Sequence, residues 1–436
     1  MKKIDETTLQ KWQENYELEK SHFITKQALA KNAINSICIN QQQINKMEQL
    51  FNINLETLPV TNQESSGRCW IFAGCNIIRE RLAKKYNLEN FELSQSYLAF
   101  YDKLEKSNYF METIRNLKDT KDDERIRDLK LETALEDGGQ WDMFVALVKK
   151  YGVVPKNVMK ETYQSSHTDQ LNHLISTKLR QFASFVLEKR TNLDALQEKT
   201  LQDIYTILID CYGIPPKEFT FEYVDKNKQY HAVENLTPKD FYEQYCDIDL
   251  EDYISIIHAP TKDKPYHRTF TVKYLGNVIE APNIKYLNLP LEEFKQLIIT
   301  QLQSLEPVWF GSDCTKAYEK TEGIWDSDMM DYDTTFQMEF YMSKENRLLT
   351  FESTMNHAMV FTGVQLVNGK SLKWKIENSW GKEKGKDGYY VASDKWFDEY
   401  VYQAVVHKKY LKANLTNILQ EDPIVLMPWD PFGTLA

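Results

Sequence analysis

The sequence lacks a long apolar run, an internal repeat and a low-complexity tract. No apolar stretch in its 436 residues is long enough to cross a bilayer. The basic start, Met1-Lys2-Lys3, is followed by neither an apolar signal segment nor a cleavage site of small residues. With 42% hydrophobic and 27% charged residues, the composition is typical of a globular protein. We therefore expect a cytoplasmic protein that has no membrane partner.

Cysteine is scarce and irregularly spaced. The six cysteines are spread over the whole chain, at Cys38, Cys69, Cys75, Cys211, Cys246 and Cys314. This spacing favours reduced thiols over a disulfide framework or paired metal ligands. No His-Glu-x-x-His, Gly-x-Gly-x-x-Gly or Walker pattern occurs, and the acidic run 326–333 lacks the glycine of a calcium loop. We expect neither a metal nor another cofactor.

The chain has no excess of positive charge. Its 53 Lys and Arg are outnumbered by 64 Asp and Glu, which gives a net charge of −11 at pH 7. This charge disfavours nucleic acid as a partner. A net charge does not describe how charges are distributed, so it does not exclude a local basic groove. Aromatic residues are plentiful, with 25 Tyr, 21 Phe and 9 Trp, and they argue against extended disorder.

Helical patterns come early in the chain and strand patterns come late. A half-buried helix is expected to begin near Cys69, and other helices are expected at 141–150, 172–190 and 194–211. After residue 305, β-branched and aromatic runs predict strands at 308–310, 357–365, 372–377, 388–392 and 401–407. This order predicts an α+β fold with two segregated halves rather than a βαβ repeat.

These changes of pattern divide the chain into five segments. We expect an N-terminal extension at 1–60, a helical lobe at 61–165, a large and mostly helical insertion at 166–285, a β-rich lobe at 286–420 and a C-terminal arm at 421–436. Three prolines exclude a regular helix in the arm. Most chain ends of this composition are frayed or packed tails.

Cys69 is the first candidate for chemistry. A thiol is a good nucleophile only as a thiolate, and both a helix N-terminus and a neighbouring imidazolium lower its pKa. Cys69 stands where the predicted helix begins, so its sulfur would meet the positive end of the helix dipole. Taken alone, Cys69 is better interpreted as a small buried hydrophobic residue.

Two downstream segments supply partners for a nucleophilic thiol. His357 opens a predicted strand, which would hold its ring rigidly, although one of eight histidines is weak evidence by itself. In the run 377–381, Asn378 could accept a hydrogen bond from the imidazole Nδ1–H and so fix the direction of the ring. The adjacent Trp380 could shield that bond from water.

Together, these residues resemble the papain-like cysteine peptidases. The family pattern around the nucleophile, Cys-Gly-[Ser/Ala]-Cys-[Trp/Tyr], corresponds here to Ser66-Gly67-Arg68-Cys69-Trp70. Ser66 replaces a cysteine that forms a disulfide in secreted relatives, and Arg68 is a second departure. The longer run 63–70 resembles the bleomycin hydrolase and bacterial aminopeptidase C branch. Further matching segments are 137–142, 151–155, 263–266 and 428–431.

The resemblance implies a papain-like two-lobed fold, with a helical lobe and an antiparallel, β-barrel-like lobe. It implies that Cys69 is the nucleophile, His357 its base and Asn378 the residue that orients the base. Gln63 would stabilise the oxyanion together with the Cys69 N–H, although it could be an ordinary surface residue. The remaining implied sites are substrate-binding positions at Gly138, Gly139, Trp380 and Ala436. The simpler reading of the Gly-Gly pair is a flexible turn.

The resemblance also implies an activity and an assembly. In this family, helical insertions build a homohexamer, and the C-terminal arm lies in the active-site cleft with its carboxylate facing the α-ammonium group of a peptide substrate. We therefore expect a cysteine aminopeptidase of broad specificity. A thiol endopeptidase of the same family remains an alternative. A nucleic-acid-binding ring and an acyl-transferring relative are disfavoured, the first by the net charge and the second by Asn378.

Overall fold

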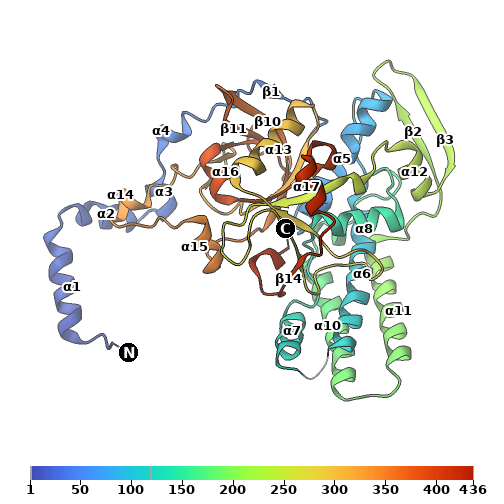
Figure 1. The fold of residues 1–436 in the computed structure, drawn as a ribbon, viewed down its shortest axis with the longest axis horizontal. Helices are drawn as coiled ribbons and strands as arrows, with labels where there is room; N and C mark the ends of the chain where they lie inside the picture. Colours follow the sequence, from blue (N-terminus) through green and yellow to red (C-terminus); the bar gives the residue numbers. More distant parts are fainter. Residues whose placement is uncertain (1, 118–119, 436) are drawn as a thin grey trace.

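The computed structural model describes residues 2–117 and 120–435 and combines helices with one large β-sheet (Figure 1). The α-helices are α1 (Glu6–Leu18), α2 (Ser21–Leu29), α3 (Ile34–Cys38), α4 (Gln41–Ile44), α5 (Cys69–Tyr86), α6 (Gln95–Asn116), α7 (Lys121–Glu132), α8 (Trp141–Tyr151), α9 (Tyr163–Ser166), α10 (Asp169–Leu187), α11 (Leu193–Tyr212), α12 (Pro238–Tyr245), α13 (Leu291–Gln303), α14 (Tyr332–Phe336), α15 (Lys344–Leu349), α16 (Asp394–Tyr400) and α17 (Ala413–Ile418). Short 3₁₀ turns lie at Leu250–Asp252 (η1), Lys408–Tyr410 (η2) and Pro431–Gly433 (η3). Within the described residues, no helix combines the length and the apolar composition needed to span a bilayer.

The sheet has twelve strands, and a separate hairpin is formed by β2 and β3. The strands are β1 (Ile53–Asn54), β2 (Phe219–Val224), β3 (Tyr230–Leu236), β4 (Tyr253–Ile257), β5 (Arg268–Val272), β6 (Tyr286–Asn288), β7 (Val308–Ser312), β8 (Tyr318–Glu319), β9 (Ile324–Trp325), β10 (His357–Val367), β11 (Lys370–Glu377), β12 (Tyr389–Ser393), β13 (Val401–His407) and β14 (Ile424–Leu426). Their order is β14-β5-β6-β4-β13-β7-β10-β11-β12-β9-β8, and β1 also pairs with β10.

Most strand pairs in this sheet are antiparallel, but three are parallel: β4 with β6, β5 with β14 and β9 with β12. The predicted antiparallel character is therefore only partly correct. At the centre, β10 lies between β7 and β11, with His357 opposite Ser312 and Val360 opposite Glu377. This register places the start of β10 beside the end of β11.

The predicted helices and late strands are present, but the segment 166–285 differs from its prediction. Its helices α10 and α11 correspond to the expected pair, whereas β2 to β6 also lie in this segment, and β4, β5 and β6 join the large sheet. All five residues of β4 are buried. A short apolar run has no periodicity that separates strand from helix, and the strands that pair with β4 lie far away in the sequence.

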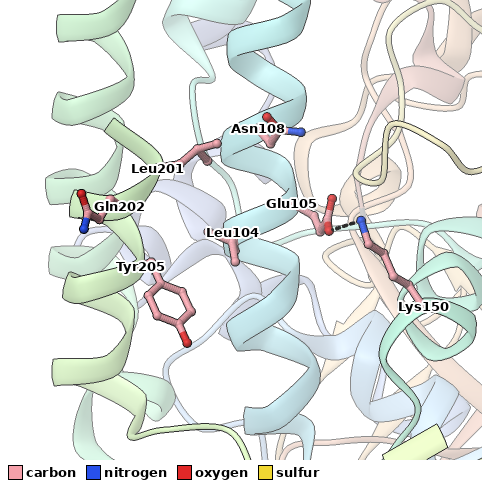
Figure 2. Close-up of a pocket in the computed structure, with 7 residues that line it drawn as sticks. All are labelled: Leu104, Glu105, Asn108, Lys150, Leu201, Gln202 and Tyr205. Atoms are coloured by element: carbon pink, nitrogen blue, oxygen red, sulfur yellow. Dashed lines mark ion pairs between the residues drawn. The ribbon is translucent and has the colours of Figure 1, made fainter. Parts of the chain in front are cut away.

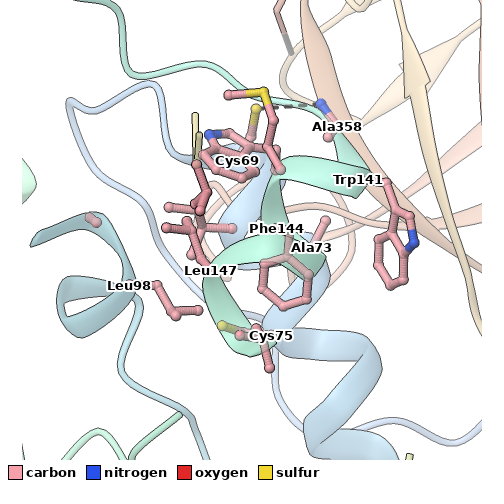
Figure 3. Packing of buried hydrophobic residues seen from close by; sticks show 14 of the residues in the cluster. Cys69, Ala73, Cys75, Leu98, Trp141, Phe144, Leu147 and Ala358 are labelled. Carbon is pink, nitrogen blue, oxygen red and sulfur yellow. Dashed lines mark hydrogen bonds between the residues drawn. The ribbon is translucent and has the colours of Figure 1, made fainter. Parts of the chain in front are cut away.

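Helix α5 packs tightly between the sheet and helix α8. The first nine side-chain positions of α5, 69–77, are all buried, as the apolar sequence there predicts. A Cβ on Gly74 would lie 2.7 Å from the ring of Phe144 in α8, so the absence of a side chain permits the close approach. Figure 3 shows Phe144, Leu147 and Cys75 in this apolar core. The packing fixes the position of the helix that begins at Cys69.

Helices α10 and α11 pack against α6 and form the helical part below the sheet in Figure 1. A small pocket of about 390 Å³ lies between α6 and α11, where Leu104 and Tyr205 contribute to its lining (Figure 2). At its edge, Glu105 of α6 pairs with Lys150 of α8, with 2.6 Å between the charged atoms. This ion pair lies outside the cleft that contains Cys69.

The two ends of the chain are placed very differently. Helix α1 projects from the rest of the molecule, whereas α2 contacts α3 and α14, and neither α1 nor α2 contributes a buried residue (Figure 1). The C-terminal segment instead returns to the body, where β14 pairs with β5 along residues 270–272. The chain end therefore approaches the cleft that contains Cys69.

Candidate active site

Cys69 is the first residue of α5, and its thiol contacts the first residues of β10. Its Sγ accepts a hydrogen bond from the backbone N–H of Ala358 at 3.4 Å, drawn as a dashed line in Figure 3. Ala358 directly follows His357, so Cys69 and His357 lie in one site although they are 288 positions apart in the chain. The thiol is buried, and the helix N-terminus and the strand N–H both place partial positive charge beside the sulfur.

His357 is held by Asn378 and covered by Trp380. Its Nε2 lies 2.9 Å from the Asn378 Oδ1, which also accepts the backbone N–H of Ser379 at 2.8 Å. We predicted this hydrogen bond for Nδ1, and that atom assignment is wrong: the ring binds Asn378 through Nε2. The Trp380 ring stacks on the imidazole with 4.8 Å between centroids. Nδ1 is thereby left as the ring nitrogen for proton exchange.

Burial shifts the pKa values of Cys69 and His357 in opposite directions. It raises the pKa of Cys69 to about 11, although the N–H groups of Ala358, Trp70 and Cys69 itself work against this rise. Burial also lowers the pKa of His357 to about 4, and the hydrogen bond with Asn378 opposes that change. Considered one at a time, both groups are neutral at pH 7.

Gln63 links the nucleophile segment to the segment after Asn378. Its Oε1 accepts the Ser379 hydroxyl at 2.6 Å, and its backbone N–H donates to the Ser379 carbonyl at 2.8 Å. Its Nε2 donates to the Ser66 carbonyl, which engages one of the two amide hydrogens. Gln63 lines the same cleft as Cys69, so the second hydrogen can serve a ligand.

Cys69 and His357 lie in a cleft of about 900 Å³. Gly138 also lines this cleft, whereas Gly139 packs beneath it: a Cβ on Gly139 would overlap the Trp70 ring. The predicted pair of substrate-binding glycines is therefore divided, with one at the cleft and one in the core. Ala436 lies outside the described residues.

The C-terminal segment lies in this cleft and is anchored at several points. Residues 428–430 and 433–435 contribute to the lining. The Thr434 carbonyl accepts a hydrogen bond from Gln140 Nε2 at 2.6 Å, and Phe432 is buried. Asp430 pairs with the buried Lys264 at 2.7 Å. These contacts fix the chain as far as Leu435 beside the catalytic candidates.

Several buried charges near the site were not identified as functional candidates from the sequence. Arg68, noted only as a departure from the family pattern, is buried and pairs with Glu161 at 3.0 Å. Asp137 appeared only as part of a matching run, yet it binds the turn before Cys69. For Arg68, a single charge directly before the apolar run 69–73 was the available signal. Among the described residues, no three or more His, Cys, Asp or Glu side chains are arranged to hold a metal ion.

Comparisons with known proteins agree with the resemblance seen in the sequence. The profile of the Peptidase C1-like family matches residues 3–433. Aminopeptidase C of Listeria monocytogenes is 44% identical over 98% of this chain and 96% of its own length. Bleomycin hydrolase of Gallus gallus is 37% identical over 92% of this chain and 91% of its own.

A solved structure is also similar over the whole length. The crystal structure of PepW from Lactobacillus rhamnosis HN001 superposes with a TM-score of 0.97 at 44% identity, covering 100% of this chain and 99% of the other. The predicted resemblance to the aminopeptidase C and bleomycin hydrolase branch is confirmed. The chain belongs to the Peptidase C1-like family and is a cysteine-type peptidase.

Proposed function

We propose that this peptidase is an aminopeptidase that releases N-terminal residues from short peptides and tolerates many side chains. The observation that carries the proposal is the course of the C-terminal segment, whose residues up to Leu435 line the cleft that contains Cys69 and His357. The names of the similar proteins support it, because seven relatives are called aminopeptidase C. A papain-like two-lobed arrangement is part of the same proposal.

The arm would select substrates by both space and charge. Residues 433–435 occupy cleft volume that a longer peptide would need on the N-terminal side of the scissile bond. A carboxylate at Ala436 would attract the α-ammonium group of a short peptide. At about 4 Å and an effective dielectric constant of about 20, this attraction is worth up to roughly 4 kcal/mol before desolvation is subtracted.

The proposed chemistry begins with proton transfer from the Cys69 Sγ to the His357 Nδ1. Either charge alone would be costly in this buried place, so the two groups ionise together as a pair. The sulfur then attacks the scissile carbonyl, and the oxyanion is held by Gln63 Nε2 and the Cys69 N–H. His357 Nδ1 returns the proton to the leaving amine. Water hydrolyses the thioester, with the same nitrogen as base.

Removal of residues 433–436 tests the role of the arm. Aminoacyl and N-acetylated chromogenic peptides are compared with both proteins, and Cys69→Ser supplies the background rate and is expected to be inactive but folded. We expect the truncated enzyme to lose activity on free-amine substrates and to gain activity on N-blocked and longer peptides. Unchanged rates on both classes would refute the proposed arm function. Activity on blocked peptides already present in the full-length enzyme would favour the endopeptidase alternative.

We also infer that several copies of the chain assemble, as a homohexamer by analogy with the family. Helices α1 and α2 support this inference because they expose Leu9, Trp12, Tyr16, Phe23 and Ile24 to solvent. An apolar surface of this kind is typical of an interface. Deletion of residues 1–30 should reduce the mass measured by light scattering; an unchanged mass would contradict the role of these helices.

The six free thiols are compatible with the proposed cytoplasmic location.

A further inference from the structure

A buried charge cluster lies beneath the turn that carries Cys69. Helix α6 contributes Lys103 and Lys106, which stand three residues apart, and both are buried. Lys103 forms an ion pair with Asp137, and its Nζ also donates to Asn172 Oδ1 at 2.5 Å. Lys106 pairs with Asp102 at 2.7 Å. Two charged pairs are thus enclosed close to the nucleophile.

Asp137 connects this cluster to the residues on both sides of Cys69. Its Oδ2 accepts the backbone N–H of Gly67 at 3.1 Å, and the Thr168 hydroxyl donates to the same oxygen. Its backbone carbonyl accepts Trp70 Nε1 at 2.7 Å. A Cβ on Gly67 would lie only 2.9 Å from the Asp137 Cβ, so the carboxylate lies directly behind the turn. Asp137 therefore binds both the first and the last residue of the turn 67–70.

Lys106 holds the other side of the same loop. Its Nζ donates to the carbonyl of Glu136 at 2.9 Å and to that of Gly138 at 2.6 Å. The loop 136–138 is consequently fixed to α6 through backbone contacts. Lys106 acts on the shape of the loop, whereas Lys103 acts on the charge of the Asp137 side chain.

That charge matters because Asp137 is close enough to act on the thiol. Its negative charge works to raise the pKa of Cys69. Burial works to raise the pKa of Asp137 itself, but Lys103 and the hydrogen bonds around the carboxylate outweigh burial and hold that pKa below its ordinary value. Burial is the largest influence on the sulfur and raises its pKa, whereas the N–H groups of Ala358, Trp70 and Cys69 lower that pKa. The Cys69 charge in turn raises the pKa of Cys314.

Building on the proposed roles of Cys69 and His357, we propose that Lys103 and Asp137 form a positioning pair for the nucleophile. Asp137 holds the Cys69 turn and its oxyanion-binding N–H in place, and Lys103 cancels the carboxylate charge that would otherwise oppose formation of the thiolate. Lys103 is not among the residues that line the cleft, whereas Asp137 is, and the role proposed for both is to position the nucleophile.

The test uses Lys103→Met and the double variant Lys103→Met/Asp137→Asn in the full-length enzyme. The readouts are kcat, KM and the pH at which inactivation by iodoacetamide reaches half its maximal rate. We expect Lys103→Met to lower kcat about tenfold with little change in KM and to move the inactivation midpoint upward by about one pH unit. The double variant removes the carboxylate charge, so its midpoint should return to the wild-type value.

Lys150→Met is the matched control, because it breaks a different ion pair of α6, the one that Glu105 forms beside the pocket in Figure 2. It should leave kcat and the midpoint unchanged. If Lys103→Met does not fold, Thr168→Val removes one hydrogen bond to Asp137 at nearly constant volume and should lower kcat in the same sense. The proposal is overturned if the Lys103→Met midpoint equals that of the wild type, if the double variant stays shifted, or if Thr168→Val leaves kcat unchanged. Peptidase activity in Cys69→Ser would instead refute the proposed function itself.

Discussion

Arg79 forms an ion pair with Glu377, with 2.7 Å between Nη2 and Oε1, although the two residues are 298 positions apart in the chain. Arg79 lies in the helix that begins at Cys69, and Glu377 directly precedes Asn378. Asn76 of the same helix donates to the same carboxylate oxygen at 2.8 Å. The helix with the candidate nucleophile is therefore joined, within the core, to the strand end that holds the imidazole.

Replacement of Arg79 by methionine should destabilise the protein strongly. Both partners are almost completely buried, at 1% and 2% exposure, so Glu377 would be left as an unpaired buried charge. Loss of one member of such a pair typically costs about 3–5 kcal/mol. Urea unfolding measures the change. Lys228→Met, which breaks the exposed pair with Glu89, is the control and should have no measurable effect; equal losses in both variants would contradict the prediction.

Glu80 should make stability decrease as the pH rises. Burial, and then the charge of Glu377, raise the pKa of Glu80 to about 7, against 4.5 for an unperturbed glutamate. Between these values the unfolded chain releases a proton that the folded protein keeps. The stabilisation is therefore complete below pH 4.5 and declines towards pH 7, with a slope of at most about 1.4 kcal/mol per pH unit. Glu80→Gln should flatten this part of the unfolding free energy against pH; equal slopes in both proteins would contradict the assignment.

The pH dependence of kcat/KM should report one proton shared by Cys69 and His357. Activity should fall as the pH drops through about 4, where the imidazole gains a proton while the sulfur keeps its own. It should fall again on the alkaline side, when the shared proton is lost, at or below the pKa of about 11 for Cys69. Asn378→Ala removes the hydrogen bond that favours the protonated ring, so it should move the acid limb to lower pH. An acid limb at 6.5, the value of a free histidine, would contradict the geometry.

Gly139→Ala should damage both packing and turnover. The added methyl group would overlap the Trp70 ring, whose backbone directly follows Cys69. Overpacking of this kind costs about 1–3 kcal/mol. Gly369→Ala is the control, because Gly369 has positive φ but nothing within 4 Å of an added Cβ, so only backbone strain of about 1 kcal/mol is expected. Equal activity in the two variants would show that the Trp70 contact does not influence the site.

The sequence was most informative where a local pattern and a chemical need coincide. The apolar run after Cys69 predicted a helix that begins near Cys69, which is the first residue of α5, and the β-branched and aromatic run after His357 predicted β10. Both residues then lie in one cleft, as the motif implied. A helix terminus and a strand start are fixed by nearby residues, which is why a single sequence reveals them.

What the sequence did not reveal depends on contacts between distant segments. The pairing of β10 with β11 determines that the His357 Nε2, and not Nδ1, contacts Asn378. The ion pairs Arg79–Glu377 and Lys103–Asp137 join residues that are 298 and 34 positions apart. The strand β4 escaped prediction because its partners, β6 and β13, are also remote. Buried charges carry no periodic signal, so only the folded chain identifies their partners.

The strand β14 lies at the border of the large sheet, bound in parallel to β5, and leads directly into the segment that occupies the cleft. A ligand that displaced this segment would have to break the contacts of Phe432 and Asp430 and also detach the edge strand β14 from β5. Under the proposed function, the space offered to a peptide is consequently set when this segment folds into the cleft. Under the proposed function, changes in the side chains of β14, which do not line the cleft, are therefore a route by which the accepted peptide length can evolve.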